Sequence, residues 1–169
     1  AQYWLKSFVK PRAHWRSLID SVAEEYAGQL ATFSQLGIDG ISKLTGLSSE
    51  DAELASQRQY GEPVAWLTEQ SPERFIQQLQ QLGANVLRGG RFIHVSGQCN
   101  KGMAMNYITS FYQQNFPDRQ WLTLALGDSH NDVAMLESAD YAGIVAQHSG
   151  TPLQLSRTKN LFRSKHYAP

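Results

Sequence analysis

The spacing of hydrophobic residues gives the first part of the chain a mixed character, in which helical and strand-like segments alternate. Trp15, Ile19 and Tyr26 recur at intervals that place them on one face of a helix. Strand-like runs flank residues 88–90 (Arg-Gly-Gly), a sequence typical of a hairpin turn. We therefore expect an α+β module with an antiparallel sheet. The pattern predicts helices at 11–28, 37–46, 48–57 and 71–83, and strands at 30–33, 63–67, 84–87 and 91–96.

The later part of the chain has a different pattern, in which helices alternate with strands that are apolar throughout. Residues 121–126 form a near-continuous apolar run, as expected of a parallel strand that is buried on both faces. A helix is predicted at 100–115 before this strand, and a short helix at 132–138 and a second buried strand at 141–145 after it. The residues expected on the inner side of the 100–115 helix are Met103, Tyr107, Ile108, Phe111 and Tyr112.

The change of pattern predicts two domains and places the boundary near residues 97–100. Residues 1–98 form the α+β module, and residues 99–169 form a layer of helices on a parallel sheet, so the chain as a whole falls in the α/β class. Hydrophobic residues make up 41% of the sequence, which is enough for a packed core.

Charge and cysteine content exclude some classes of partner. The 15 basic and 15 acidic residues balance, so the chain has no electrostatic feature that would attract nucleic acid or an acidic membrane surface. No apolar stretch of the sequence approaches the length of a transmembrane helix. The single cysteine, Cys99, has no internal disulfide partner. The single cysteine favours a cytoplasmic protein.

The strongest chemical signal follows the apolar strand at 121–126. Asp128 and Asp132 lie in the next loop and the first helical turn, where open α/β sheets bind their ligands. Carboxylates in this position suit Mg²⁺, which binds a few carboxylates together with water and substrate phosphate. Alternatively, Asp128 or Ser129 caps the helix and Asp132 complements the helix dipole. This alternative does not explain why Asn131 is present as well.

A second signal is Lys101, which lies in the first turn of the predicted 100–115 helix. A lysine there opposes the helix dipole at a cost of roughly 0.3–1 kcal/mol. A bound anion would reverse this cost, since helix N-termini themselves bind anions. Lys101 is therefore a candidate phosphate ligand. The alternative is an ordinary solvated surface lysine.

Together, Lys101 and the 127–132 sequence resemble two motifs of the haloacid-dehalogenase phosphatases: a lysine at a helix start, and Gly-Asp-x-x-Asn-Asp after a core strand. The resemblance implies that Asp128 binds Mg²⁺ directly, that Asp132 assists through water or an outer contact, and that Asn131 supports the loop or the phosphate. It also implies a fold, namely the C-terminal part of a Rossmann-like hydrolase core joined to an α+β cap domain.

Two stretches of the first module narrow this resemblance to the mannosyl-3-phosphoglycerate phosphatases, of the Cof-like group. Residues 58–63 (Arg-Gln-Tyr-Gly-Glu-Pro) are similar to the Arg-Glu-Tyr-Ser-Glu-Pro stretch of that family. Residues 88–94 (Arg-Gly-Gly-Arg-Phe-Ile-His) are similar to a stretch of its cap domain. The resemblance covers roughly residues 32–145. It implies hydrolysis of mannosyl-3-phosphoglycerate to mannosylglycerate.

The residue types in these stretches suit an anionic sugar. Arginines can each bind two oxygens of a carboxylate or phosphate, paired glycines allow a ligand to approach the backbone, and a histidine and a glutamate can bind hydroxyl groups. Each residue also has an ordinary explanation: a plain turn, solvated arginines and a core histidine. The candidate substrate-binding residues are Arg58, Glu62, Arg88, Gly89, Gly90, Arg91 and His94.

The nucleophile of the family is expected to lie outside this chain. The family reaction passes through an aspartyl-phosphate formed on an Asp-x-Asp-Gly-Thr motif, and the sequence contains no such motif. Residues 38–41 (Ile-Asp-Gly-Ile) are only superficially similar. The chain also starts at Ala1 without methionine and ends at Pro169 without the final helix of the family. We therefore expect a fragment that is inactive alone, derived from an active phosphatase.

Other functions stay open at this point. A phosphatase of the same class could use glucosyl-3-phosphoglycerate or sucrose phosphate. A second possibility is a non-catalytic module that binds an anionic sugar, and a third is a structural fragment without a ligand. The sequence does not determine the sugar or the oligomeric state.

Overall fold

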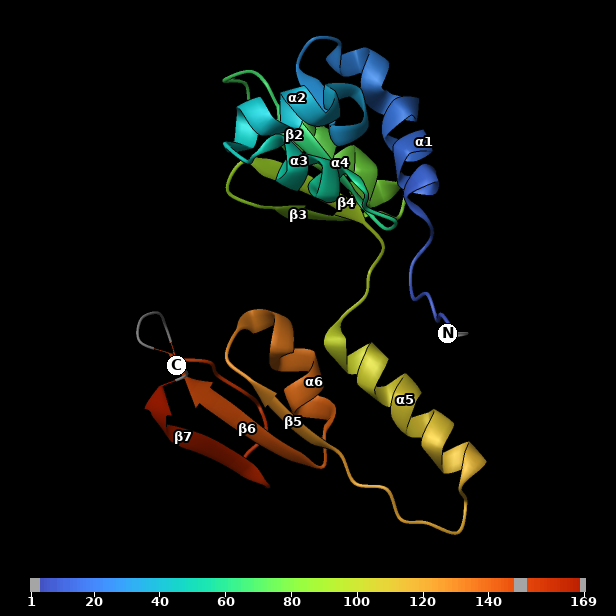
Figure 1. Cartoon of the computed structure of the whole chain (residues 1–169), viewed down its shortest axis with the longest axis vertical. Helices are drawn as coiled ribbons and strands as arrows, with labels where there is room; N and C mark the ends of the chain where they lie inside the picture. The colour runs from blue at the N-terminus through green and yellow to red at the C-terminus, as the bar shows by residue number, and fades with distance from the viewer. Residues whose placement is uncertain (1–3, 148–151, 168–169) are drawn as a thin grey trace. The chain divides into compact units, whose positions relative to one another are not determined.

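A computed structural model describes residues 4–147 and 152–167. The described residues fall into two compact units, which meet at the bond between Gln98 and Cys99 (Figure 1). We call residues 1–98 the first unit and residues 99–169 the second unit. None of the helices in the described part of the chain is long and apolar enough to cross a membrane.

The first unit is built on a four-stranded sheet in the order β1-β2-β4-β3, with every pair antiparallel. The antiparallel arrangement predicted from the sequence is therefore confirmed. Strands β3 and β4 form the predicted hairpin around residues 89–91. The strands are β1 (Leu30–Thr32), β2 (Glu62–Trp66), β3 (Asn85–Arg88) and β4 (Phe92–Ser96).

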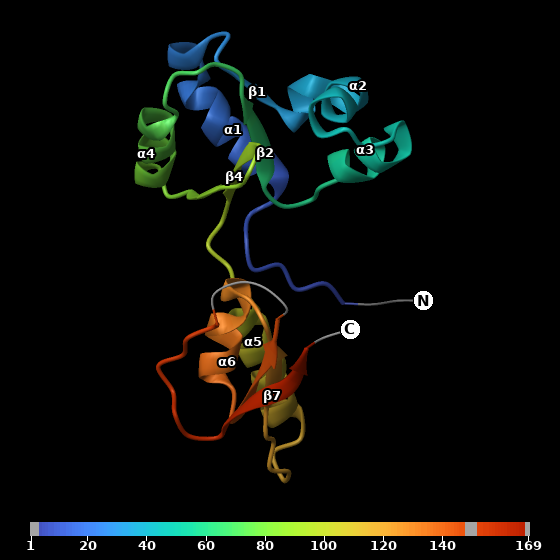
Figure 2. The ribbon, with the colours of Figure 1, turned by 90° about the vertical axis from the view of Figure 1, so that its left-hand side faces the viewer.

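Helices cover both faces of this sheet. Figure 2 shows α4 and the α2–α3 pair on opposite sides of β2 and β4. Successive residues of β4 divide between the two faces, as strand geometry requires: Ile93 packs with α1 and α4, whereas Phe92 packs with α2 and α3. The helices are α1 (Arg12–Ala23), followed by a 3₁₀ turn (Glu24–Tyr26), α2 (Phe33–Thr45), α3 (Ser49–Ser56) and α4 (Glu73–Gln81).

Local capping explains where two of these helices, α2 and α3, begin. Ser48, where the sequence predicted a helix to start, caps α3, because its side chain accepts the N–H of Asp51 at 3.1 Å. Helix α2 begins earlier than predicted, since Thr32 and Gln35 form a capping box. Gly37, with φ of 63°, bends the helix at the residue where the sequence predicted its start.

The second unit contains a three-stranded parallel sheet in the order β5-β6-β7, which confirms the predicted parallel layer. Strand β7, the last of these strands, was not among the elements predicted from the sequence. The buried core includes Leu136 of α6 and Ala142 and Ile144 of β6. The elements are α5 (Lys101–Asn115), β5 (Leu124–Gly127), a 3₁₀ turn (His130–Asp132), α6 (Val133–Ser138), β6 (Tyr141–Ala146) and β7 (Leu161–Tyr167).

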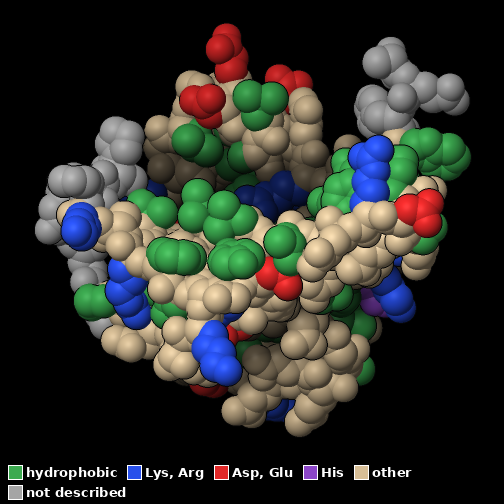
Figure 3. Space-filling model, turned by 90° about the horizontal axis from the view of Figure 1, so that it is seen from below, with side chains coloured by type: hydrophobic (Ala, Val, Ile, Leu, Met, Phe, Trp, Pro, Cys, Tyr) green, Lys and Arg blue, Asp and Glu red, His purple; other side chains and the backbone are tan. Residues whose placement is uncertain are grey.

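Two sequence-based predictions about burial are wrong for this chain. Strand β5 is buried on one face only, and on its other face Leu124 and Leu126 are 66% and 61% exposed. The expected inner residues of α5 are exposed as well. The physical reason is that β5 pairs only with β6 among the described strands, and that α5 packs chiefly against α6. Figure 3 shows hydrophobic side chains gathered on the face seen from below. The exposed apolar residues of this region include Met103, Tyr107, Ile108, Phe111, Tyr112, Phe116 and Leu122.

Candidate functional site

The loop that follows β5 is closed by the side chain of Asp132. This carboxylate is buried, and its Oδ2 accepts the backbone N–H groups of Asp128 and Ser129, both at 3.1 Å. The hydroxyl of Ser129 also donates to Oδ2, at 3.1 Å. These contacts form a capping box at the start of the 3₁₀ turn. Asp132 therefore fixes the backbone that carries Asp128.

Two glycines allow this arrangement. A Cβ on Gly127 would overlap the Asp132 side chain and lie 2.7 Å from its Cγ. A Cβ on Gly102 would lie 2.7 Å from the carbonyl oxygen of Ala134 in α6. Both distances are far below van der Waals contact, so a side chain at either position would push the elements apart. Because Gly127 has no side chain, the loop can fold around Asp132. Because Gly102 has none, the start of α5, which carries Lys101, can approach this loop.

Lys101 and Asp132 are in direct contact, although they are 31 residues apart in the sequence. The Nζ atom of Lys101 donates to Oδ1 of Asp132 at 2.5 Å. The Asp132 side chain is 4% exposed, whereas that of Lys101 is 53% exposed. The lysine can therefore present its remaining N–H groups to a ligand while it stays paired with Asp132.

The surroundings of Asp132 hold it in the charged form. Burial alone raises the pKa of a carboxyl group, but here the ammonium of Lys101 and the donors from Asp128 and Ser129 outweigh burial and lower the pKa of Asp132 to about 2. Asp132 is thus an anion at neutral pH. Its charge keeps Lys101 in place.

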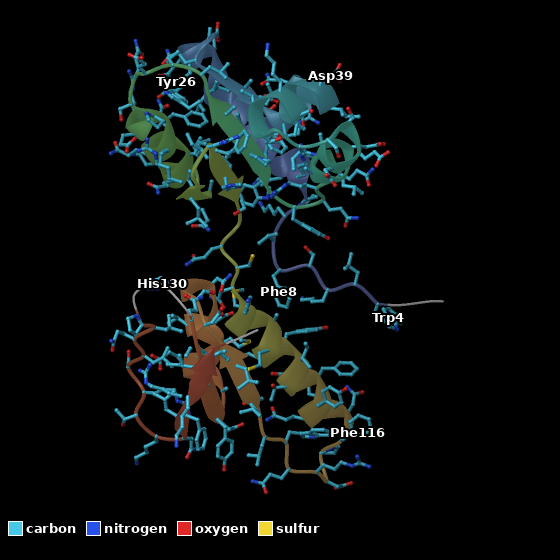
Figure 4. All side chains as sticks on the ribbon, turned by 60° about the vertical axis from the view of Figure 1, so that its left-hand side comes forward. Trp4, Phe8, Tyr26, Asp39, Phe116 and His130 are labelled. Atoms are coloured by element: carbon cyan, nitrogen blue, oxygen red, sulfur yellow. The ribbon has the colours of Figure 1, made fainter. Side chains whose placement is uncertain are left out.

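Asp128 and Asn131 lie on the exposed side of the same loop. One carboxylate oxygen of Asp128, Oδ2, accepts the side-chain amide of Gln147 at 3.0 Å. The amide oxygen of Asn131 accepts the hydroxyl of Ser129 at 2.7 Å. Figure 4 labels His130, which lies in this loop and is exposed. The structure therefore brings together, at the carboxyl end of β5, the predicted residues Lys101, Asp128, Asn131 and Asp132.

This donor set fits a hard cation that takes most of its ligands from elsewhere. Within the part of the chain that the structure describes, no group of three or more His, Cys, Asp or Glu side chains could hold a metal. The exposed carboxylate of Asp128 is available to an ion, whereas both oxygens of Asp132 already bind protein donors. One open carboxylate backed by a second suits Mg²⁺, which keeps several waters and binds substrate phosphate.

In the first unit, Glu62 has a structural role. Its side chain is fully buried, pairs through Oε2 with the Nε of Arg12, and accepts at Oε1 the N–H of Ser34 at 3.0 Å and its hydroxyl at 3.2 Å. Both carboxylate oxygens are used inside the protein. Glu62 was predicted to accept hydrogen bonds from sugar hydroxyls, but both of its oxygens accept hydrogen bonds from Arg12 and Ser34. The buried charge of Glu62 is compensated by Arg12, which is 50 residues away in the sequence.

The two arginines of the β3–β4 turn also have partners within the protein. Arg88 forms an exposed ion pair with Glu73 at 2.9 Å. Arg91 donates through Nη1 to the carbonyl oxygens of Leu44 and Thr45, at 3.0 and 3.2 Å, at the end of α2. A cation suits that position because the last carbonyls of a helix lack helical partners. Both arginines stay exposed, so a ligand could still contact them.

The turn borders a pocket of the first unit. Arg88, Gly89, Gly90 and Arg91 line one side of a cavity of about 430 Å³, and residues of the 66–72 loop line the other. The lining is mostly polar, and the volume would hold a molecule the size of a monosaccharide.

His94 lies in β4, whereas Arg58 lies in the loop between α3 and β2. His94 occupies β4 between Pro63 of β2 and Leu87 of β3, and a Cβ on Gly89 would lie 3.0 Å from its Nε2. Arg88 pairs with the preceding residue, Ile93, so its side chain lies on the opposite face of the sheet from that of His94. Burial lowers the pKa of His94, and the positive charge of Arg58 lowers it further. His94 is therefore a neutral donor or acceptor at neutral pH.

Sequence reasoning missed Arg12, Gly102 and Gly127 as residues that shape these sites. Arg12 could have been found by the argument used for Lys101, because it too is a cation in the first turn of a helix. Asp39, the acid at 38–41 that superficially resembles the nucleophile motif, is exposed on α2 (Figure 4) and does not follow a strand.

Two known proteins with similar sequences are named as phosphatases. A glucosyl-3-phosphoglycerate/mannosyl-3-phosphoglycerate phosphatase from Methanococcoides burtonii is 32% identical over 136 residues, which is 80% of this chain and 49% of that protein. A phosphatase of the same name from Persephonella marina is 29% identical over 126 residues, or 74% of this chain and 46% of that protein. The chain thus spans about half the length of these curated relatives. The expected similarity to mannosyl-3-phosphoglycerate phosphatases is confirmed.

A solved structure is also similar, at a lower level. The sucrose-phosphatase of Synechocystis sp. PCC6803, in complex with sucrose and phosphate, matches 90% of this chain and 57% of its own, with a TM-score of 0.43 and 20% identity. The sequence profile of the haloacid dehalogenase-like hydrolases matches residues 50–165, well over half of the chain. This protein therefore belongs to the haloacid dehalogenase-like hydrolase family, with the α/β fold of that family.

Proposed function

We propose that this chain is part of a Mg²⁺-dependent phosphatase that hydrolyses the phosphate ester of mannosyl-3-phosphoglycerate to mannosylglycerate. The observation that carries the proposal is the contact of Lys101 with Asp132 beside the exposed Asp128, at the carboxyl end of a parallel strand. A cation for the phosphate and a carboxylate for a metal are thus close together, as the stabilisation of charge on a transferring phosphoryl group requires.

The roles follow from the contacts. Lys101 binds the phosphate and Asp132 fixes the direction of its ammonium group. Asp128 is the direct ligand of Mg²⁺, while Asp132 acts on the ion through water or through the loop. Asn131 keeps the loop in shape through Ser129. When bound, Mg²⁺ neutralises charge on the phosphate oxygens.

The nucleophile is proposed to come from a segment outside these 169 residues. The family reaction would form a bond between an aspartate oxygen and phosphorus, break the bond to the glycerate oxygen, and then release phosphate by attack of water. Two observations support an external segment: the relatives are about twice the length that aligns, and β5 and α5 expose apolar side chains of the kind that hydrolase cores bury. We expect the 169-residue chain alone to be inactive.

The first unit is proposed to select the substrate, as a cap domain, and the second to be the C-terminal part of the hydrolase core. Arg58 and His94 are the proposed contacts on the sheet, and the Arg88–Arg91 turn with its polar pocket is a further candidate surface. The relatives are named for both glucosyl and mannosyl substrates, so glucosyl-3-phosphoglycerate is the first alternative. Sucrose phosphate and a non-catalytic role in binding an anionic sugar are the others.

The test is phosphate release in the presence of Mg²⁺ from mannosyl-3-phosphoglycerate, glucosyl-3-phosphoglycerate and sucrose phosphate. It is run on this chain and on a version extended upstream, with Asp128→Asn of the extended version as the control. We expect release only from the extended version, with the mannosyl substrate preferred and the Asp128→Asn variant inactive. If the extended version releases phosphate from none of the three, the phosphatase proposal fails and the binding role is favoured.

A further inference from the structure

The segment 57–61, which carries Arg58, is held by one residue of α1. Arg12 contacts it at three places. Its Nη1 donates to the carbonyl oxygen of Ser56, just before the segment, and its backbone N–H donates to the carbonyl oxygen of Gln59, within it, at 2.8 Å. Its Nε pairs with Glu62, directly after the segment. Arg12 thus holds the segment at its start, in its middle and at its end, through its side chain and its backbone N–H.

The position of Arg12 is itself fixed. Glu62 is 1% exposed and receives two further hydrogen bonds from Ser34, so it cannot follow the guanidinium to another place. Among the described residues, Nη2 of Arg12 is buried without a hydrogen-bond partner. An unsatisfied buried donor is unfavourable for stability. The burial of the Arg12 side chain is therefore better explained by its role in positioning segment 57–61 than by a contribution to folding stability.

The segment ends beside His94. Pro63, the residue after Glu62, lies opposite His94 in the β2–β4 pair. Gly89 leaves room for the imidazole ring on the other side, since a Cβ there would lie 3.0 Å from its Nε2. The positive charge of Arg58 lowers the pKa of His94, in addition to the effect of burial. The anchored segment therefore brings an exposed guanidinium to a half-buried imidazole.

We propose that Arg12 is a positioning residue that holds Arg58 beside His94, and that these two side chains form a ligand-binding corner for a molecule with an acidic group next to hydroxyl groups. The permanent cation binds the acidic group and the neutral imidazole binds a hydroxyl. The ligand chemistry rests on the proposed phosphatase function, whereas the role of Arg12 does not.

The test is the pH titration of the His94 ring by NMR in the 169-residue chain, with the signal assigned by its loss in His94→Gln. Arg12→Lys keeps a positive charge for Glu62, but a single ammonium group cannot reach Glu62 and Ser56 together. We expect Arg58→Gln to raise the pKa of His94, Arg12→Lys to raise it as well, and the double variant to match Arg58→Gln alone. Arg16→Lys, an exposed position on the same helix, should change nothing.

Two results would overturn the proposal: an unchanged His94 titration in Arg12→Lys while Arg58→Gln raises it, or an unchanged titration in Arg58→Gln. Arg12→Gln with Glu62→Gln gives a second form of the test, because it removes both buried charges at once and leaves neither unpaired. It should give the same shift as Arg12→Lys. The titration needs neither substrate nor turnover, so its outcome is separate from that of the phosphate-release assay.

Discussion

The ammonium of Lys101 lies 2.5 Å from a carboxylate oxygen of Asp132. Asp132 is also buried and accepts backbone N–H groups, so this contact fixes the position of the candidate site in the second unit. The lysine cannot move away without leaving a buried charge unpaired. The loop cannot open without removing three donors from the other oxygen. One carboxylate therefore holds both the proposed metal ligand, Asp128, and the proposed phosphate ligand, Lys101.

The first prediction concerns acid pH. The pKa of Asp132 is lowered from 3.8 to about 2, so its charged form stabilises the folded chain above pH 4, and this contribution is lost as the pH falls from about 4 to about 2. Because Lys101 is half exposed and screened by solvent, we expect on the order of 1–2 kcal/mol. Urea unfolding of the wild type and of Asp132→Asn at pH 6, 4 and 2 measures it.

The two proteins should differ in unfolding free energy at pH 6 and converge at pH 2. Asp118→Asn, which changes an exposed acid of the same unit, is the control and should follow the wild type throughout. A constant difference between wild type and Asp132→Asn across this range would contradict the low pKa.

The second prediction concerns Gly127. A methyl group there would overlap Asp132, so Gly127→Ala should destabilise the second unit by about 2–3 kcal/mol and displace the loop. Unfolding in urea gives the free energy, and the NMR shifts of the Asp128 and Ser129 amides report the loop. Unchanged amide shifts would mean that the loop does not depend on this contact.

A matched glycine pair tests the turn of the first unit. Gly89→Ala places a methyl group 3.0 Å from Nε2 of His94, whereas Gly90→Ala meets nothing within 4 Å. We expect Gly89→Ala to shift the ring signals of His94, and Gly90→Ala to leave them unchanged. Equal effects of the two substitutions would show that His94 does not pack against Gly89.

Buried and exposed ion pairs should respond very differently to loss of a charge. Glu62→Gln leaves the guanidinium of Arg12 without its buried partner, and we expect a loss of about 3–5 kcal/mol. Glu25→Gln breaks the exposed pair with Arg74 and should cost less than about 1 kcal/mol. Urea unfolding compares them. Similar small losses would show that the Arg12–Glu62 pair is not buried in solution.

Local signals made the boundaries of several helices predictable. Ser48, at the start of the predicted 48–57 helix, caps α3, because capping depends on residues within one turn. Helix α4 begins at Glu73, two residues after its predicted start. Lys101 and Asp132 were both recognised from their motifs. Their contact was not predictable, since it joins residues 31 apart and depends on how α5 packs on α6.

Other features depend on distant partners that a pattern does not reveal. Glu62 lies in a motif that resembles a substrate-binding stretch, but its environment is set by Arg12 and Ser34. The apolar run 121–126 predicted a strand buried on both faces, whereas Leu124 and Leu126 are exposed here. A hydrophobic run predicts that a segment is buried in the folded protein. It does not predict which elements of a given chain cover that segment.

The exposed side of β5 gives the last prediction. In the 169-residue chain, Leu124→Ser should change the unfolding free energy by less than about 0.5 kcal/mol, since the side chain is already 66% exposed. Leu136→Ala, in the buried core of the same unit, should cost about 2–5 kcal/mol and serves as the control. In the version extended upstream, a proposed segment covers β5, and Leu124→Ser should then become costly, by about 2 kcal/mol. If Leu124→Ser is equally mild in both versions, the upstream segment does not pack on this face of β5, and the proposed source of the nucleophile loses its structural support.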